Sequence, residues 1–421
     1  MSTLVHTDRY PTRGDLVLVL NCGSSSIKFA LFDAGQSPLP RQPVWNGKIQ
    51  GIGRSPTTYG ETGMTPVPVE LDAAQPYHAA LEHIRERVLA RLGGRRLCAV
   101  THRVVHGGMK YFDPVRVDQT VLADLRGYVP LAPLHQPFAL EAIDVLLRTR
   151  PDLPQVACFD TGFHQTLPKV EQVLPIPYAA WERGLRRYGF HGLSYDYISR
   201  ALPERIGDAA RGRTIVAHIG SGASLCAMHG LRSVATTMGF SALDGLMMGT
   251  RCGALDPGAV IYLMEIEKLT LEQVGHVLYN ESGLLGLSGV SADTPVLMPL
   301  ETRQDDTGER VRTALALYVR RIVREIGSLA AVLQGLDVLV FTAGVGEHSA
   351  EIRKRVCTEL GWLGISLDAD ANAADAPVIS APGSHVTVVV EPTNEEWVAA
   401  RHCLDVLGPA PLSRPVPTGD A

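Results

Sequence analysis

The sequence predicts an α/β fold built in two parts, and three observations carry this prediction. Short apolar segments that suit β-strands alternate along the chain with longer segments that have the apolar spacing of helices. Glycine-containing turns follow three of the apolar segments, at Gly23, Gly220 and Gly344. The first two turns start 220 − 23 = 197 residues apart, nearly half of the 421 residues, which hints at a duplicated unit. We therefore expect two α/β parts with a cleft between them.

The first half begins with a predicted β-hairpin. Residues 17–20 are apolar, the turn NCGSSS follows, and residues 27–33 (IKFALFD) alternate as a half-buried strand does. Apolar residues then recur at helical spacing over 76–92, and residues 97–105 suit a strand. Helices are predicted over 117–129 and 137–149, and a buried strand over 155–159.

The second half repeats this opening. An apolar segment at 214–219, the turn GSGAS and a strand at 225–229 predict another hairpin. Helices are predicted near 257–268 and 271–281, and a long one over 309–334. A buried strand over 337–342 leads into the turn at 343–347 and a helix to about 360; a strand over 385–390 and a helix over 394–407 close the chain.

Composition excludes several classes of protein. At roughly 150 residues per domain, 421 residues correspond to two or three domains. With 39 Lys+Arg and 44 Asp+Glu the net charge is −5, and no basic run suggests a nucleic-acid scaffold. The longest apolar runs fall short of the about 18 residues of a membrane span, and residues 1–14 lack the apolar core of a signal peptide. We expect a cytoplasmic protein that binds neither nucleic acid nor membrane.

Cysteine and histidine spacing argues against a disulfide framework and a zinc site. The seven cysteines form no Cys-x-x-Cys pair, and the 14 histidines show no zinc-ligand spacing. The cysteines are therefore expected to be small buried side chains in a reducing compartment.

The glycine-containing turns are candidate phosphate cradles. Glycine lets the backbone approach an anion, and backbone N–H groups and serine hydroxyls donate to its oxygens. The chain has neither G-x-x-x-x-G-K-[ST] nor G-x-G-x-x-G, so P-loop and Rossmann sites are not supported. Each turn alone could be an ordinary hairpin turn, but three of them after buried strands favour phosphate binding.

Five further segments place polar residues just past apolar stretches: THRVVHGG (101–108), APLHQP (132–137), FDTGFHQTLP (159–168), RRYGFHG (186–192) and MMGTRCGALDPG (247–258). A single histidine in them could be a structural side chain. Histidine and arginine beside paired glycines favour an anion site instead. Near the end, TNEE at 393–396 begins a helix, where the acids either stabilise the helix N-terminus or bind magnesium.

Taken in order, these segments resemble the acetokinase family. The resemblance runs from about residue 16 into the helix after 393 and rests on NCGSSSIKF, HRVVHGG, APLHQP, FDTGFHQT, YGFHG, HIGSGAS, MGFSALDGLMMGTRCG, SGLLGLSG, FTAGVGE and PTNEE. It implies two actin-like (ribonuclease H-like) domains with mixed sheets flanked by helices and a cleft between them. The first would comprise 14–161 and 393–421, and the second, 162–392, would carry most of the nucleotide site. A homodimer is also implied.

The resemblance implies reversible, Mg-dependent transfer of the γ-phosphoryl group of ATP to acetate by in-line attack, giving acetyl phosphate and ADP. Mn could replace Mg. Two arginines would clamp the acetate carboxylate and the phosphoryl group, and histidines would donate to the phosphoryl oxygens. An aspartate would orient rather than abstract a proton, because acetate is already ionised at neutral pH. By their places in the motifs, these catalytic residues are Arg103, His135, Asp160, His191 and Arg251.

The remaining residues implied by the resemblance bind the two substrates and the metal. The acetate pocket would consist of Arg103, Val105, Leu134 and Phe190, and the metal would be linked to Asn21 and Glu395, with Glu396 beside it. ATP and its phosphates would be bound by Ser24, Ser26, Lys28, His218, Gly220, Ser221, Gly222, Asp293, Gly344, Val345, Gly346 and His348.

The chain departs from the family pattern around the edge of this site, at Gln136, Leu193, Tyr195, Ser221, Ala242, Thr294, Pro295 and His348. Ala242 replaces a proline beside the methyl pocket, and Thr294 and Pro295 replace residues that contact the adenosine. The acyl-chain cutoff, the nucleotide base and the direction of the reaction therefore stay open. A propionate or butyrate kinase of the same family is an alternative. A non-catalytic nucleotide-dependent switch is a further one, disfavoured because Arg103, Asp160 and Arg251 are all present.

Overall fold

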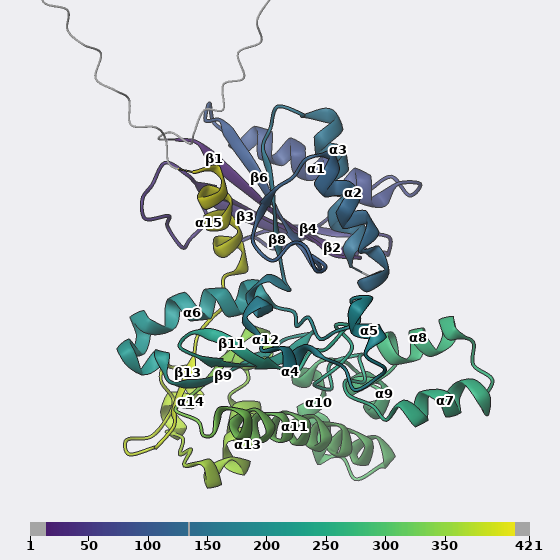
Figure 1. The fold of residues 1–421 in the computed structure, drawn as a ribbon, viewed down its shortest axis with the longest axis vertical. Coiled ribbons are helices and arrows are strands. Elements are labelled where there is room, and N and C mark those ends of the chain that lie inside the picture. Colours follow the sequence, from purple (N-terminus) through teal and green to yellow (C-terminus); the bar gives the residue numbers. More distant parts are fainter. Residues whose placement is uncertain (1–13, 134, 409–421) are drawn as a thin grey trace, which may run out of the picture. The chain divides into compact units, whose positions relative to one another are not determined.

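The computed structural model describes residues 14–133 and 135–408 (Figure 1). The described residues form two compact units. The first unit contains the residues up to Phe159 and those from Asn394 onward, and the second unit contains Asp160–Thr393. Leu134, predicted to line the acetate pocket, lies outside the described residues.

The first unit is built on a mixed sheet of eight strands in the order β5-β4-β3-β2-β1-β6-β8-β7. Strands β1 and β2 form an antiparallel hairpin, whereas β6 runs parallel to both β1 and β8. The strands are β1 Leu16–Cys22, β2 Ser26–Asp33, β3 Trp45–Gln50, β4 Thr58–Glu61, β5 Val67–Pro68, β6 Leu97–Val104, β7 Val115–Arg116 and β8 Gln155–Phe159.

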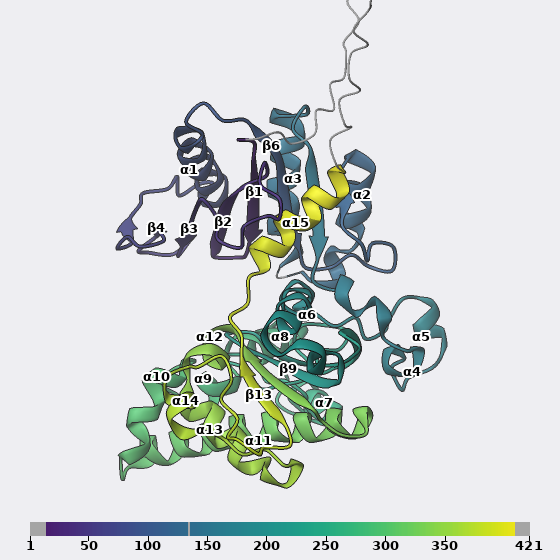
Figure 2. The ribbon, with the colours of Figure 1, turned by 90° about the vertical axis from the view of Figure 1, so that its left-hand side faces the viewer.

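Helices cover both faces of this sheet. Alternate residues of β1 and β2, such as Leu18, Leu20, Phe29 and Leu31, bury one face in a core with α1 and α3. Helix α15 packs on the opposite face, across β1 and β6 (Figure 2). The helices are α1 Pro76–Arg91, α2 Gln119–Gly127, α3 Gln136–Thr149 and α15 Glu395–Leu407, with a short 3-10 turn at Val129–Leu131.

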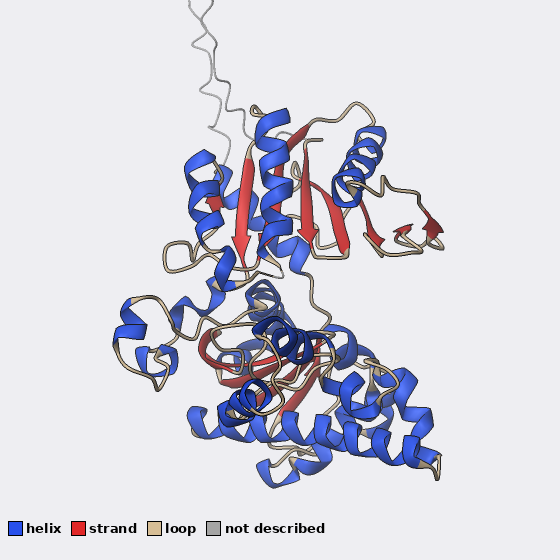
Figure 3. Cartoon of the chain, turned by 90° about the vertical axis from the view of Figure 1, so that its right-hand side faces the viewer, coloured by secondary structure: helices blue, strands red, loops and turns tan. Residues whose placement is uncertain are grey.

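The second unit has a five-stranded mixed sheet in the order β11-β10-β9-β12-β13, flanked by helices (Figure 3). Its strands are β9 Arg213–Ile219, β10 Ala223–His229, β11 Arg232–Thr236, β12 Val338–Thr342 and β13 Thr387–Val390. Its helices are α4 Lys169–Gln172, α5 Ala179–Glu182, α6 Gly192–Ile206, α7 Pro257–Glu265, α8 Leu271–Asn280, α9 Gly283–Ser288, α10 Thr294–Leu297, α11 Asp306–Leu333, α12 Ala343–His348, α13 Ala350–Glu359 and α14 Ala369–Ala373. Short 3-10 turns lie at Gly162–Thr166, Gly207–Arg211, Met298–Thr302 and Gly361–Leu363.

The two sheets share a topology. In the first unit β3, β2 and β1 pair antiparallel, and β6 and β8 continue the sheet in parallel. In the second unit β11, β10 and β9 pair antiparallel, and β12 and β13 continue in parallel. This repeat explains the two similar hairpin sequences half a chain apart, and it confirms the predicted pair of mixed sheets flanked by helices.

Each predicted strand and helix is present, with bounds that differ by a few residues. The prediction did not include strands β3, β4, β5, β7 and β11 or helices α4, α5, α6, α9, α10 and α14. Strand β3 (WNGKIQ) buries only one residue, and its sequence lacks the apolar alternation by which a strand is recognised. The predicted turn at 343–347 was wrong in one respect, because it is the short helix α12. No helix in the described residues has both the length and the apolarity to cross a membrane.

Candidate active site

In the first unit, the ends of β1, β2 and β6 place three predicted site residues on one face of the sheet. Asn21 pairs directly with Lys28 across the hairpin. Leu20 pairs with His102, so Asn21 and Arg103 are the next residues along neighbouring parallel strands and share a face. This is the face on which α15 packs. Two cations and an amide therefore meet the first turn of α15.

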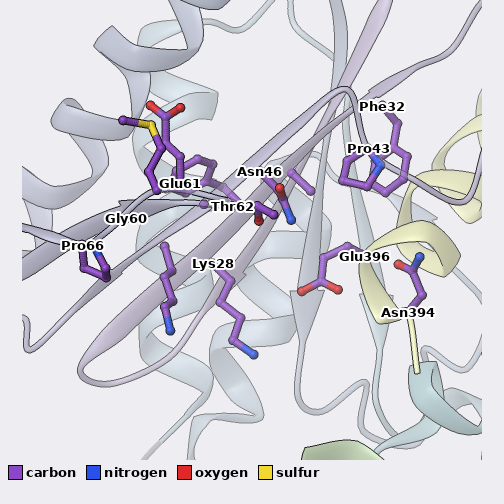
Figure 4. A pocket seen from close by; sticks show the side chains of 15 residues that line it. Lys28, Phe32, Pro43, Asn46, Gly60, Glu61, Thr62, Pro66, Asn394 and Glu396 are labelled. Atoms are coloured by element: carbon purple, nitrogen blue, oxygen red, sulfur yellow. The ribbon is translucent and has the colours of Figure 1, made fainter. Parts of the chain in front are cut away.

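Glu395 and Glu396 occupy that first turn. The Arg103 guanidinium donates from Nη1 to Glu395 Oε2 over 2.8 Å, and both side chains are largely shielded from solvent. Glu396 lines a pocket of about 540 Å³ together with Lys28 and Asn394 (Figure 4). Burial raises the pKa of the Glu396 carboxyl, the charge of Glu395 raises it further, and Lys28 and Arg103 oppose the shift. The predicted metal-linked acid is thus held by the predicted catalytic arginine.

The first hairpin turn presents two of the predicted phosphate ligands. Ser24 is exposed in the turn, and Ser26 opens β2. The Gly23 N–H donates to the Ser26 carbonyl over 2.8 Å, which closes the turn tightly. The Ser24 hydroxyl is therefore displayed at the end of the sheet that carries Asn21.

Two loops of the first unit are tied together by Gln136. Its amide donates to the His106 carbonyl over 2.9 Å and accepts from the His106 N–H over 3.1 Å. His106 follows Val105 in the loop after β6, and His135 is the residue that precedes α3. Gln136 is completely buried. This departure from the family pattern thus positions the loop of the expected methyl pocket against that of His135.

In the second unit, the turn between β9 and β10 lies against His191 and Arg251. A β-carbon on Gly222 would lie 3.3 Å from His191 Nε2 and 3.6 Å from Arg251 Nη1. Glycine at this position leaves open the space beside these two groups, which any side chain would enter. Arg251 Nη1 also donates to the Ala242 carbonyl over 3.0 Å, and burial lowers the pKa of this guanidinium.

Backbone strain and close packing place His191 beside Asp160. His191 has the left-handed φ of 58°, which costs a non-glycine residue about 1 kcal/mol. The next residue, Gly192, donates its N–H to the Asp160 carbonyl over 2.8 Å, and a β-carbon there would clash with that oxygen. Phe190 is buried, and its carbonyl lies 2.9 Å from His164 Nε2. Three predicted residues, Asp160, Phe190 and His191, are therefore brought together.

His218 lies at the end of β9 and stacks on His191. The ring centroids are 4.1 Å apart and the ring planes differ by 18°. His218 Nδ1 lies 2.8 Å from the Ser194 hydroxyl. A β-carbon on Gly220 would lie 4.0 Å from His218 Nε2, so the first glycine of the turn borders the second histidine. Ser221 is exposed between the two glycines.

Helix α12 carries Gly344, Val345, Gly346 and His348 directly after β12. Two sets of hydrogen bonds hold it. Glu347 Oε1 accepts from the N–H groups of Ala343 and Thr393, over 2.7 and 3.1 Å. Fully buried Arg353 donates to the carbonyls of Gly346 and Glu347, over 3.0 and 2.7 Å, and to Asn372. Gly344 is exposed with open space around it, whereas the His348 side chain points largely into solvent.

Asp293 is not brought to these groups by any contact in the described residues. It is exposed at the start of α10, and its N–H donates to the Ser291 hydroxyl over 3.1 Å. The neighbouring Thr294 is buried, and its hydroxyl has no hydrogen-bond partner within the described part of the chain. Of the predicted groups, the residues expected near the nucleotide base have the fewest contacts with the rest of the candidate site.

The first unit offers oxygen ligands for a metal ion, but they do not form a complete coordination site of protein side chains. Ranges 14–133 and 135–408 contain no cluster of three His, Cys, Asp or Glu side chains that could hold an ion. The candidates Asn21 and Glu395 supply an amide and a carboxylate oxygen. Mg²⁺ is usually held by one or two carboxylates together with substrate phosphates and water, so this sparse donor set fits it.

Several residues that support the site carry no signal in the sequence. Ser224 and Ser194 contact the two stacked histidines, and Tyr195 contacts Ser224. Arg353 and Glu347 hold α12. Tyr195 had been noticed only as a departure from the family pattern. An arginine inside a helix, such as Arg353, gives no local signal that it is buried.

Comparisons with known proteins concern the family and the fold of the chain. The model of the acetokinase family matches residues 16–401. An acetate kinase of Rhodopseudomonas palustris is 49% identical over 393 residues, covering 92% of this chain and 97% of that protein. The crystal structure of Porphyromonas gingivalis acetate kinase has a TM-score of 0.82 at 36% identity, covering 94% of this chain and 100% of that one. A propionate kinase structure from Francisella tularensis has a TM-score of 0.84 at 32% identity, covering 92% and 98%.

Proposed function

The chain belongs to the acetokinase family, and from that premise we propose how its residues transfer the γ-phosphoryl group of ATP to acetate. A carboxylate oxygen of acetate attacks the γ-phosphorus in line, the bond to the β-phosphate oxygen breaks, and acetyl phosphate and ADP result. Both reactants are anionic. The protein must therefore neutralise charge and align the reactants, because there is little covalent chemistry for it to perform.

The observation that carries the proposal is the convergence of His191 Nε2 and Arg251 Nη1 beside Gly222. A histidine and a half-buried arginine at a glycine turn form a preorganised set of donors for phosphoryl oxygens, on which charge develops during transfer. Backbone N–H groups of the turn add further donors. The switch alternative would also bind phosphates, but it would have no need for Arg103 and Arg251 as two arginines facing an acyl substrate, so the site favours phosphoryl transfer.

Arg103 binds the acetate carboxylate in this proposal, and Asp160 orients the reacting groups. A planar guanidinium suits a carboxylate because it can donate two parallel hydrogen bonds. The ion pair with Glu395 holds the Arg103 side chain in one place before the substrate arrives. Acetate is already ionised at neutral pH, so Asp160 has no proton to remove.

We propose Mg²⁺ as the metal, with Asn21 and Glu395 as the residues that would hold it, directly or through water. One oxygen of Glu395 accepts from Arg103, and the carboxylate has further lone pairs for a metal-bound water. When bound with ATP, the ion supplies charge neutralisation on the phosphate chain. Mn²⁺ prefers similar oxygen ligands. A homodimer, implied by the family resemblance, is part of the proposal and is tested by the molar mass in solution.

Acetate is the first acceptor in this proposal, and propionate is the second candidate. The similarity to a propionate kinase structure and the small side chain of Ala242 both favour some use of the longer acid. A methylene group of fit is worth only about 1–3 kcal/mol, so discrimination between the two acids is expected to be modest.

Trapping of acyl phosphates with hydroxylamine tests the proposal. The purified chain is incubated with ATP, Mg²⁺ and acetate, propionate or butyrate, and hydroxamate formation is measured. We expect the order acetate, propionate, butyrate in catalytic efficiency. Hydroxamate formation with none of the three acids would refute the proposed activity, and equal efficiency with butyrate and acetate would favour the butyrate kinase alternative.

A further inference from the structure

His191 is the first member of a chain of hydrogen bonds that runs into the interior of the second unit. His191 Nδ1 lies 2.8 Å from the Ser224 hydroxyl on β10, and the Tyr195 hydroxyl on α6 lies 2.5 Å from the same oxygen. Ser224 and Tyr195 are completely buried. Tyr195 is four positions after His191 in the chain, so the start of α6 brings both side chains to β10.

The number of hydrogens on each group determines which atom donates and which accepts in the hydrogen bonds from Tyr195 through Ser224 to His191. Within the described residues, the Ser224 hydroxyl is the one partner of the Tyr195 hydroxyl. Tyr195 must donate to Ser224, because leaving its buried O–H unpaired would cost about 1–3 kcal/mol. Ser224 accepts from Tyr195 and has a single hydrogen of its own, which it donates to His191 Nδ1. His191 Nδ1 is therefore an acceptor.

The consequence concerns the other nitrogen of the ring. A neutral imidazole carries one proton, so with Nδ1 accepting, the proton is on Nε2. This is the nitrogen that lies beside Gly222, as Arg251 Nη1 also does. The opposite tautomer would present a lone pair there, which repels the oxygens of a phosphoryl group.

We propose that Tyr195 is a positioning residue that, through Ser224, holds His191 in the tautomer whose Nε2–H donates to the transferring phosphoryl group. This inference rests on the proposed phosphoryl transfer for its role in catalysis. The tautomer itself is a property of the protein without substrates. Tyr195 stands where the family pattern has a histidine, so the inference gives this departure a function in this chain.

The variant Tyr195→Phe tests the proposal because it removes only the hydroxyl group. In Tyr195→Phe, Ser224 can accept from Nδ1–H instead, and the two tautomers of His191 become mixed. The measurement is the pair of imidazole 15N shifts of His191 in the substrate-free protein with 15N-labelled histidine, assigned by the signals lost in His191→Gln. We expect a protonated Nε2 and an unprotonated Nδ1 in the parent chain, and partial protonation of Nδ1 in Tyr195→Phe.

Kinetics supply the second measurement. We expect kcat of Tyr195→Phe to fall by about tenfold to a hundredfold, with KM for ATP and acetate within about threefold, because the lost orientation acts on the transition state. The matched control is Tyr188→Phe, which removes another buried hydroxyl of the second unit, one that donates to the Gly184 carbonyl over 2.8 Å. The control should keep both the tautomer and kcat.

Several outcomes would overturn the proposal. A parent chain with Nδ1 protonated would contradict it, as would an unchanged tautomer in Tyr195→Phe. If Tyr195→Phe does not fold, Ser224→Ala makes the same break in the chain and must show the same shift. A parent chain that forms no acyl phosphate yet shows the expected tautomer would refute the proposed function and leave the assigned hydrogen-bond chain intact.

Discussion

Arg251 is the residue that we propose binds an anion, and its surroundings bear on that role. Its guanidinium is mostly removed from water, and the Ala242 carbonyl, a neutral acceptor, holds one end of it. Interactions between charges are stronger where solvent screening is reduced, so a phosphoryl group or carboxylate placed against this half-buried guanidinium gains more than it would at a fully exposed arginine. The position is therefore consistent with the proposed role in binding charge.

We expect Arg251→Ala to lower kcat by about 10²–10⁴-fold, because it removes preorganised charge from the transition state. The fold should be retained, since shortening the side chain also removes the cost of burying its charge. The measurement is hydroxamate formation with circular dichroism as the check on folding. Arg232→Ala, at an exposed arginine of β11, is the control and should keep normal turnover. Near-parental turnover of Arg251→Ala would refute its assignment.

At the scale of one turn, a substitution of Gly222 is expected to change activity without changing stability. Its backbone does not have the positive φ that demands glycine, so alanine is sterically possible for the backbone. The added methyl group would instead stand 3.3 Å from His191 Nε2 and 3.6 Å from Arg251 Nη1.

We expect Gly222→Ala to lower kcat/KM by about tenfold or more while the midpoint of urea unfolding changes little, since the methyl group enters the substrate space and not the core. Gly127→Ala is the control, because a β-carbon at this helical glycine meets nothing within 4 Å. Equal activity of the two variants would show that the turn does not contact the substrates.

At the scale of a helix, the C-terminal end of α12 is stabilised by a guanidinium group from another helix, α13. Arg353, on α13, supplies donors to the last carbonyls of α12 and to Asn372 on α14, and it also pairs with Asp375. Carbonyls at a helix end have no partner within the helix, so a buried donor stabilises them. One arginine thus fixes three elements around the predicted nucleotide loop.

We expect Arg353→Met to lower the free energy of unfolding by about 3–5 kcal/mol, because the buried acceptors are left without donors. KM for ATP should rise as α12 loosens. Urea unfolding and ATP kinetics measure the two effects. Lys354→Met, at the exposed neighbouring position of α13, is the control. A loss of stability below about 1 kcal/mol would mean that α12 is held by other contacts.

At the scale of the whole molecule, buried histidines make both units sensitive to acid. Burial lowers the pKa of His102 and His106 in the first unit and of His164 in the second to about 4, from an ordinary value of 6.5. Between these values the unfolded chain binds protons that the folded chain excludes. Stability is therefore fully present above pH 6.5 and decreases as the pH falls toward 4, by up to about 3 kcal/mol per histidine.

Urea unfolding at several pH values between 7 and 4 measures this dependence. We expect His102→Gln to be less stable than the parent at pH 7 and to have a shallower pH dependence, because one of the groups that take up a proton is gone. His385→Gln, at an exposed histidine, should keep the parental slope. A parental slope in His102→Gln would show that this histidine is not held neutral in the folded state.

The sequence by itself determined the fold class, the family, the glycine turns and the strands and helices with strong apolar patterns. Apolar alternation and helical spacing act over a few residues, so they report β1, β2, β9 and α11 directly. The same logic missed β3, whose sequence WNGKIQ has little apolar alternation, and α6, which begins inside a glycine-containing motif and has a proline near its end. The repeated hairpins were visible, but the shared order of the two sheets was not.

Only the tertiary structure decided which side chains meet. Arg103 and Glu395 are 292 positions apart in the chain, and His191 and Ser224 are 33 apart, yet each pair is within hydrogen-bond distance. In the sequence, Tyr195 is only a departure from the family motif, whereas in the structure its hydroxyl lies within hydrogen-bond distance of Ser224. The physical reason is that a buried polar group must find its partner among whatever residues the packed core brings near it, and that choice extends beyond any local pattern.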